Sequence, residues 1–381
     1  MTKIEKAKYI WKNCFQDSEE ETNFYFEKHF QEAQWKYYSK EDKILSSLHE
    51  NPYTLKIKDS LSSYPYIVGV ATLPEDRGQG YMTKLLLEEM LNLRKKNVDF
   101  CFLLPINPMI YRGFGFEYFS RKEEYSFDIS LLPSQKRNDS IQILEITKEN
   151  LEKHWKDWKK IYSISMIPYT LYEERDFNSF KNLLEEIYLS EGKIYLFYQK
   201  NRPSGYLILD TEEDKIHIRE FLGTNHKAYL DMFAFLKGYQ EYYSKIQIMS
   251  PENSNLEFFF KNQCKIEKKS SPFFMGRILQ VQSFLQKLQF IAPEITIFIE
   301  DPILFENTGY YTLTSEVSFT QNHIENYDFQ IGIRELLPLV LGFFSFQDLI
   351  RLGKVKLHSV EHLAKIETLF TRKFNYFHQY W

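Results

Sequence analysis

A glycine turn between a strand-like segment and a helical segment constrains the fold of this chain more than any other feature. Residues 67–72, Ile-Val-Gly-Val-Ala-Thr, are rich in the β-branched side chains that favour strands. Residues 81–93 place apolar side chains at helical spacing. Between them, Arg77-Gly-Gln-Gly80 allows backbone N–H groups to face a ligand at a helix N-terminus, where the helix dipole favours an anion. The sequence therefore predicts an anion-binding turn between a strand and a helix.

Spacing excludes two common nucleotide-binding loops. The chain has no Gly-x-x-x-x-Gly-Lys-Ser/Thr sequence, and Gly78-Gln-Gly80 lacks the third glycine of the dinucleotide fingerprint. The turn resembles instead the acetyl-CoA motif of the GNAT N-acetyltransferases, Arg/Gln-x-x-Gly-x-Gly/Ala after a strand. Met82 departs from that motif, because the superfamily has a small residue there. Without the rest of the chain, a purely structural glycine turn is the commoner interpretation.

Length and composition limit the class of protein. A chain of 381 residues predicts two or three domains, and a hydrophobic fraction of 43% with 17% aromatic residues is enough for packed cores. The net charge of −4 gives no general attraction to nucleic acid or to an anionic membrane. No apolar run is long enough for a transmembrane helix, the first residues lack a signal peptide, and three scattered cysteines form no metal or disulfide pattern. We therefore expect a cytoplasmic protein.

The N-terminal region predicts two helices with an acidic corner between them. Ser18 and Glu21 have the spacing of a capping box. The acidic residues of this corner have two interpretations. They are the solvated start of a capped helix, or Asp17 and Glu20 face a cationic acceptor.

A short helix is predicted after a second buried strand at 98–104. Asn107-Pro108 suits a helix start, and Gly113 and Gly115 end the helix after about one turn. The pattern Ile-Tyr-x-x-Phe-Gly-Phe at 110–116 resembles the Eis family (enhanced intracellular survival, aminoglycoside N-acetyltransferases). The resemblance implies that Tyr111 faces the sulfur of CoA as the general acid. From the residues alone, a tyrosine in this setting more often packs in the core.

The resemblance extends over nearly the whole chain and implies a mixed α/β (α+β) fold of two tandem GNAT-like domains followed by a sterol-carrier-protein-like domain. The expected domains are 1–130, 131–284 and 285–381, and the family resemblance also implies a hexamer. In the second domain the chain has Phe-Leu-Gly-Thr-Asn at 221–225 in place of the glycine turn, so we expect this domain not to hold CoA phosphates. A helix is expected there at 228–243. His358 and His362 are four residues apart without the glutamate of a metalloprotease helix, and no metal site is predicted.

Acetyl transfer needs a site for acetyl-CoA, a polarised thioester, an acid and a base. We expect the backbone of Val70 and Thr72 to bind the pantetheine arm as an added strand would, and a backbone N–H near Val70 to support the oxyanion. Tyr111, with an ordinary phenol pKa of ~10, would protonate the departing thiolate. The expected cofactor-binding residues are Val70, Thr72, Arg77, Gly78, Gln79, Gly80, Tyr81 and Met82.

The family attributes the base to the C-terminal carboxylate, here that of Trp381. The aromatic residues before it would desolvate that carboxylate and raise its pKa, although the sequence leaves open whether it takes the proton or anchors an ammonium group. At Tyr380, a family member with broad aminoglycoside activity has an acid instead. This difference bears on the specificity for aminoglycosides more than on the chemistry. The expected acceptor-binding residues are Asp17, Glu20 and Tyr380.

The sequence thus predicts acetyl-CoA-dependent transfer to a primary amine of a small cationic acceptor, aminoglycoside-like or another polyamine. Two alternatives remain open at this point. The first is a protein lysine N-acetyltransferase. The second is a non-catalytic protein that binds lipids or small molecules through its C-terminal domain.

Overall fold

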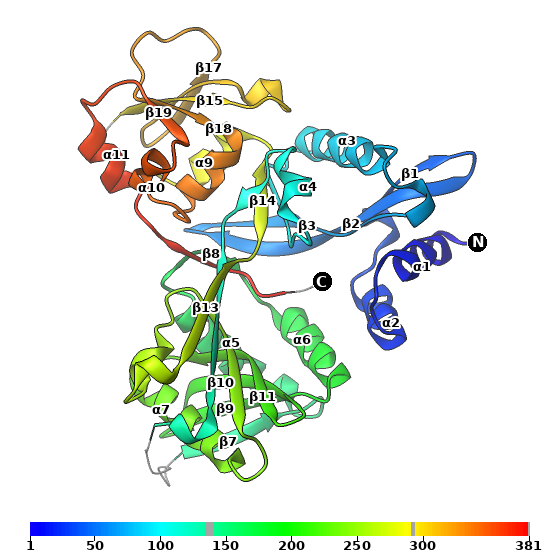
Figure 1. Cartoon of the computed structure of the whole chain (residues 1–381), viewed down its shortest axis with the longest axis vertical. Coiled ribbons are helices and arrows are strands. Elements are labelled where there is room, and N and C mark those ends of the chain that lie inside the picture. The colour runs from blue at the N-terminus through cyan, green and yellow to red at the C-terminus, as the bar shows by residue number, and fades with distance from the viewer. Residues whose placement is uncertain (134–140, 291–293, 380–381) are drawn as a thin grey trace. The chain divides into compact units, whose positions relative to one another are not determined.

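The computed structural model describes residues 1–133, 141–290 and 294–379, and the chain forms two compact units (Figure 1). The first unit combines Met1–Ser120, Thr170–Glu174 and Phe273–Trp381, and the second combines Arg121–Tyr169 with Arg175–Pro272. The predicted mixed α/β architecture is confirmed. The expected domain boundaries after residues 130 and 284 stay predictions, because the compact units are discontinuous in sequence.

The first unit contains an eight-stranded sheet of order β20-β8-β2-β3-β4-β14-β5, with β1 paired to β2. Strand β2 is buried over eight consecutive residues, because helices or loops cover both of its faces. The neighbouring strand β3 carries the β-branched residues of the predicted strand. The strands are β1 (Trp35–Lys40), β2 (Lys43–Ile57), β3 (Ser60–Thr72), β4 (Phe100–Leu103), β5 (Glu117–Tyr118), β8 (Tyr169–Glu173), β14 (Met275–Ile278) and β20 (Phe374–Tyr376).

Four helices of the N-terminal segment pack on this sheet. They are α1 (Lys3–Cys14), α2 (Glu19–Lys28), α3 (Tyr81–Lys95) and α4 (Pro108–Arg112). Side chains of α1 share an apolar cluster with Val68, whereas those of α3 share another with Ile67. Because neighbouring residues of a strand point to opposite faces, α1 and α3 cover opposite faces of the sheet, as Figure 1 shows. The capping box of Ser18 and Glu21 is confirmed.

The C-terminal part of the same unit has a five-stranded sheet of order β17-β16-β15-β18-β19. Its elements are α8 (Val281–Lys287), β15 (Ile295–Glu300), β16 (Gly309–Leu313), β17 (Val317–Thr320), β18 (Phe329–Gly332), α9 (Ile333–Val340), α10 (Phe346–Arg351), β19 (Val355–Leu357) and α11 (Leu363–Leu369). A fully buried ion pair joins it to the first sheet, since Arg277 Nη2 of β14 lies 2.7 Å from Asp301 Oδ2. Removing one partner of such a buried pair is strongly destabilising, because the other charge is left uncompensated.

The second unit is built on a seven-stranded sheet of order β13-β6-β12-β11-β10-β9-β7. Its elements are β6 (Arg121–Asp128), β7 (Ile141–Ile146), α5 (Leu151–Ser165), α6 (Phe177–Leu189), β9 (Lys193–Gln199), β10 (Arg202–Glu212), β11 (Lys215–Gly223), α7 (His226–Leu236), β12 (Lys245–Pro251) and β13 (Glu267–Pro272). The helix expected at 228–243 is shorter than predicted: the α-helix ends at Leu236 and a 3-10 turn that contains Gly238 follows. None of the helices in the described ranges is both long and apolar enough to span a bilayer.

Candidate active site

Strands β3 and β4 separate within the first sheet. They are parallel, but they pair only at Tyr66 with Phe102 and at Ile67 with Leu103. Strand β4 ends there, whereas β3 continues to Thr72. Among the described residues, no strand pairs with this side of β3 after Ile67. An extended ligand fits such an edge as an added strand, and the structure places Val70 and Thr72 along it.

A β-bulge lies in the same stretch of β3. Ser47 of β2 pairs with Ala71 and His49 pairs with Val68, so that Gly69 and Val70 together oppose the single residue Leu48. Gly69 has a φ of +59°, the left-handed conformation that glycine adopts without strain. Bulges redirect the backbone and are common beside active sites. The backbone at Val70 is therefore turned out of the regular ladder where β3 has lost its partner.

The glycine turn lies beyond β3 and is open. Gly78 and Gly80 have φ values of +79° and +76°, and a side chain on either would meet nothing within 4 Å. Gly80 is the N-cap of α3 and supplies no side-chain cap, so the first N–H groups of the helix are available to an anion. Arg77 Nε donates to the carbonyl oxygen of Thr72 at 3.2 Å, which ties the turn to the end of β3.

The other predicted cofactor-binding residues surround this helix start. Tyr81 and Met82 open α3 and are partly buried, and Gln79 is exposed. The ring of Tyr81 stacks on that of Tyr38 at 5.3 Å. Lys84 lies over both rings, with Nζ 5.9 Å from the centre of Tyr81 and 5.6 Å from that of Tyr38. The sequence prediction missed Lys84, although a cation in the first turn of a helix is unfavourable unless an anion is bound there.

Tyr111 lies on the short helix α4. The side chain of Asn107 caps this helix by accepting from the N–H of Met109 at 3.0 Å, as the Asn-Pro start predicted. Tyr111 is 7% exposed and shares an apolar cluster with Ile67 and Leu103, the last pair before β3 and β4 separate. Its hydroxyl has no hydrogen-bond partner among the described residues. Burial raises the pKa of Tyr111 to about 12, so the hydroxyl keeps its proton at physiological pH.

The acidic corner is only partly available to a ligand. One carboxylate oxygen of Asp17, Oδ2, accepts a hydrogen bond from the indole Nε1 of Trp11 at 2.8 Å. Glu20 is exposed in the first turn of α2. No hydrogen bond or ion pair joins either residue to Tyr111 or to the glycine turn within the described ranges.

The last described residues approach the point where β3 and β4 separate. The buried ring of Phe377 packs at 5.7 Å from that of Tyr66 and 4.9 Å from that of Phe102. Gln379 is also buried, and its Nε2 donates to Glu173 Oε2 at 3.2 Å. Tyr380 and Trp381 lie outside the described residues. The residues just before them are buried and include the aromatic side chains of Tyr376 and Phe377.

The corresponding helix start in the second unit is closed. Strands β11 and β12 are parallel and also pair over only part of β11, at residues 215–218. There, however, the side chain of Asn225 caps α7 by accepting from the N–H of Ala228 at 3.0 Å. A side chain at Gly223 would lie 3.1 Å from the ring of Tyr229. The helix start that is uncapped and open in the first unit is thus capped by a side chain of the protein here.

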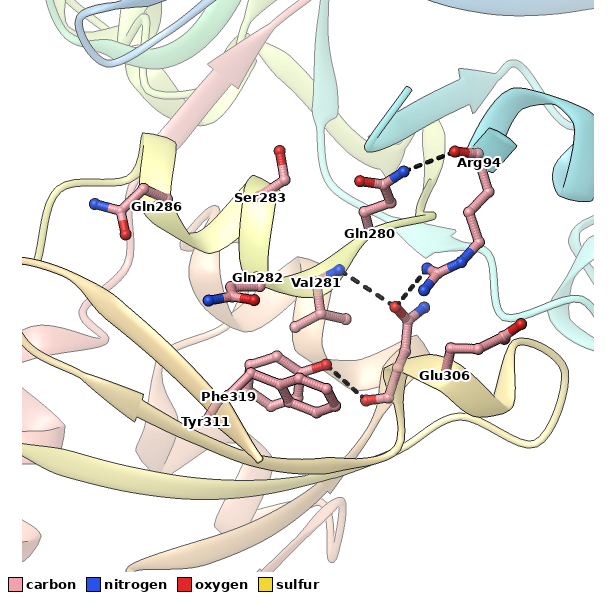
Figure 2. A pocket seen from close by; sticks show the side chains of 10 residues that line it. Arg94, Gln280, Val281, Gln282, Ser283, Gln286, Glu306, Tyr311 and Phe319 are labelled. Atoms are coloured by element: carbon pink, nitrogen blue, oxygen red, sulfur yellow. Dashed lines mark hydrogen bonds between the residues drawn. The ribbon is translucent and has the colours of Figure 1, made fainter. Parts of the chain in front are cut away.

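A separate cavity of about 440 Å³ lies at the far end of α3, between Arg94, α8 and strands β16 and β17 (Figure 2). Arg94 Nη1 donates to Asn307 Oδ1 at 2.8 Å, and Tyr311 donates to the carbonyl oxygen of Asn307 at 2.9 Å. Helix α3 has 15 residues, so this cavity is about 22 Å from the glycine turn. Arg94 and Tyr311 both donate to Asn307. We therefore interpret the cavity as part of the contact between the first sheet and the C-terminal sheet, and not as part of the site.

Comparison with known proteins defines the class of this chain. The Acetyltransferase (GNAT) domain family matches residues 1–119, and a second family of the same description matches residues 174–278. The Sterol carrier protein domain family matches residues 281–378. The chain is therefore a GNAT acetyltransferase with two GNAT domains and a C-terminal sterol carrier protein domain.

Several solved structures share the fold over nearly the whole chain. A probable N-acyltransferase of unknown function from Enterococcus faecalis V583 superposes with a TM-score of 0.87 at 18% identity, over 99% of this chain and 97% of the other. A GCN5-related N-acetyltransferase from Anabaena variabilis gives 0.80 at 17% identity, over 98% and 95%. Eis1 from Mycobacterium abscessus gives 0.79 at 14% identity, over 99% and 97%. No curated protein matches the chain in sequence. The chain thus has two GNAT domains and a sterol carrier protein domain in this order, and it shares the fold of these structures.

Proposed function

We propose that this protein transfers the acetyl group of acetyl-CoA to a primary amine of a small cationic acceptor, at the point where β3 and β4 separate. The observation that supports the proposal is that three features of the first domain lie next to one another. The unpaired edge of β3 leads to the open start of α3, and Tyr111 packs against the last residues of the paired ladder.

The residues present fit acetyl-CoA as the donor. The left-handed glycines and the uncapped start of α3 suit the pyrophosphate, and Arg77 and Lys84 bring positive charge to the same turn. The edge of β3 from Val68 to Thr72 suits the amide-containing pantetheine arm. The second domain lacks these features, so we propose that it is a scaffold.

The sheet separates Tyr111 from Phe377, which lies near the end of the described chain. Tyr111 belongs to the apolar cluster on the α3 face, whereas Phe377 belongs to the cluster on the α1 face. A thioester carbonyl held in the gap beyond Ile67 would be accessible from both faces. The acceptor amine would then approach from the α1 face, and the sulfur would leave toward Tyr111.

In the reaction, the amine nitrogen attacks the thioester carbonyl carbon, the C–S bond breaks, and the proton of Tyr111 passes to the sulfur. In this proposal the N–H of Val70, which lies in the bulge of β3, stabilises the oxyanion. A phenol with a pKa of about 12 is a weak acid for a thiolate in water. The apolar surroundings that raise the pKa of Tyr111 also disfavour the free thiolate, which favours the transfer.

The remaining proton, released by the amine, is assigned in this proposal to the α-carboxylate of Trp381. Support comes from the resemblance to the Eis family and from the buried chain up to Gln379. Asp17 and Glu20 are proposed to attract the cationic acceptor together with Tyr380. Asp17 has one carboxylate oxygen not used by Trp11.

An acceptor screen tests the proposal. Release of free CoA thiol from acetyl-CoA is measured with aminoglycosides, linear polyamines and a lysine-containing peptide. We expect turnover with small polycationic amines that exceeds turnover with the peptide. Preference for the peptide would support a protein lysine acetyltransferase instead, and no turnover with any amine would refute the proposed activity. Analytical ultracentrifugation of the same preparation tests the hexamer that the family resemblance implies.

A further inference from the structure

The ring of Trp11 occupies the space that a side chain at Gly69 would need. A Cβ built on Gly69 would lie 2.4 Å from Cζ3 of Trp11 and 3.0 Å from its Cε3. Trp11 is 5% exposed and comes from α1, which is 58 residues away in sequence. The bulge of β3 is therefore packed directly beneath an indole ring.

The ring itself is held in one orientation. Its Nε1 donates to Asp17 Oδ2 at 2.8 Å. The ring of Tyr25 stacks on it at 4.4 Å and 18°, and the ring of Phe26 packs edge-on at 5.7 Å and 83°. A hydrogen bond at one edge and rings on two sides leave the indole little freedom.

Helix α1 also follows β3 beyond the bulge. The Sγ of Cys14 lies 3.4 Å from the carbonyl oxygen of Thr72, the same oxygen that accepts from Arg77. The helix thus touches β3 at Gly69 and again at Thr72, on either side of the proposed oxyanion donor Val70. The backbone between these two points is fixed from the α1 face.

We propose that Trp11 is a positioning residue for acetyl transfer, whose indole ring holds the Gly69 bulge and so aims the N–H of Val70 at the thioester oxygen. This inference rests on the proposed function. A regular ladder would pair Gly69 and Val70 with β2 one by one and would shift the backbone of Val70. The left-handed φ of Gly69 and the indole ring together keep the bulge in place.

The expected effect is on the rate of acyl transfer and not on the affinity for CoA. Loss of one oxyanion-hole donor typically lowers kcat by ~10² to 10³, and a displacement of ~1 Å already costs ~10²-fold. The glycine turn and α3 are proposed to bind the phosphates. Among the described residues, no hydrogen bond or ring contact joins them to the indole ring. A purely structural role of Trp11 would lower the melting temperature without separating kcat from CoA affinity.

The test compares Trp11→Phe with the matched control Trp35→Phe. Trp35 is 4% exposed and belongs to the same apolar cluster. The atoms nearest to a Cβ at Gly69 come from Trp11 and His49, not from Trp35. For Trp11→Phe we expect a kcat about 10²-fold lower, with the CoA dissociation constant from calorimetry within about threefold of wild type. Trp35→Phe is expected to keep kcat within about threefold. An unchanged kcat in Trp11→Phe, or an equal loss in Trp35→Phe, overturns the inference.

A second variant moves the ring from the other side. In Gly69→Ala the added methyl group displaces Trp11 while leaving it in the chain, and kcat is expected to fall. This variant decides the question if Trp11→Phe does not fold, because an unchanged kcat in Gly69→Ala overturns the inference as well. A wild type that releases no thiol with any amine refutes the proposed function, and this inference with it. An active wild type with an active Trp11→Phe variant refutes the inference alone.

Discussion

Replacing Gly80 by aspartate tests the most distinctive feature of the site, the open start of α3. The substitution places a carboxylate where the proposed pyrophosphate approaches the helix N-terminus. Because a side chain at Gly80 meets nothing within 4 Å, no steric clash accompanies the change. The remaining structural cost is the left-handed φ of +76°, about 1–2 kcal/mol for most residues and less for aspartate and asparagine.

The electrostatic cost follows from Coulomb's law. A carboxylate about 5 Å from a phosphate, at an effective dielectric constant of about 20, is repelled by about 3 kcal/mol. Such a loss weakens binding by about 10²-fold. The repulsion is partly screened, so the loss shrinks as the salt concentration rises.

Isothermal titration calorimetry with CoA measures this loss, and two variants separate its causes. Gly80→Asn has the same shape and the same backbone strain without the charge, so we expect it to lose much less affinity than Gly80→Asp. Gly238→Asp adds the same charge in the second unit, at another glycine with open space, and is expected to bind CoA as wild type does. Equal affinities of Gly80→Asp and Gly80→Asn would refute the assignment of the phosphate site to this turn.

Three further predictions address the proton-transfer groups and the buried polar core. Tyr111→Phe removes the proposed acid and should lower kcat by ~10² or more, with little change in the KM for acetyl-CoA. A kcat near that of wild type in steady-state assays would show that Tyr111 only packs in the core. A Gly-Ser extension after Trp381 displaces the proposed carboxylate by several ångströms, at ~3.3–3.6 Å per residue. It should lower kcat/KM for the amine far more than the same extension before Met1 does. Equal activities of the two extended proteins would refute the proposal that the terminal carboxylate is the base. Burial lowers the pKa of His49 to about 3. The neutral form of His49 therefore makes its full contribution to the free energy of unfolding above pH ~6.5. Below that pH, this contribution falls by up to ~1.4 kcal/mol per pH unit. Urea unfolding at pH 7 and pH 5 should show this loss in wild type and a smaller one in His49→Gln, and identical losses would contradict the assignment to His49.

Short-range patterns were sufficient to predict the parts of the site that lie close together in the sequence. The strand, the glycine turn and the start of α3 follow from β-branched residues, two glycines and helical spacing within 67–93, and the structure has these elements. The cap of α4 by Asn107 likewise depends on neighbours only. The roles of Tyr111 and of the glycine turn in binding and catalysis stay predictions.

Features that depend on distant residues were not predictable in this way. Nothing local to Gly69 indicates that Trp11 fills the space beside it, because the contact depends on the packing of α1 across the sheet. The sequence predicted an ordinary phenol for Tyr111, whereas burial raises its pKa to about 12. Lys84 is a different case, since a lysine in the first turn of a helix was visible in the sequence as an unfavourable choice without an anion.

The interrupted first unit has a consequence for how the protein is made. Its main sheet needs β14 and β20, so the sheet that carries the proposed site stays incomplete until Tyr376 has been synthesised. Ribosomes add about 5–20 residues per second, and the roughly 250 residues after Ser120 therefore take on the order of 10–50 s. The second unit, whose last residue is Pro272, can close earlier. During that interval the nascent N-terminal segment exposes unpaired strand edges. A fragment of residues 1–120 alone is therefore expected to aggregate.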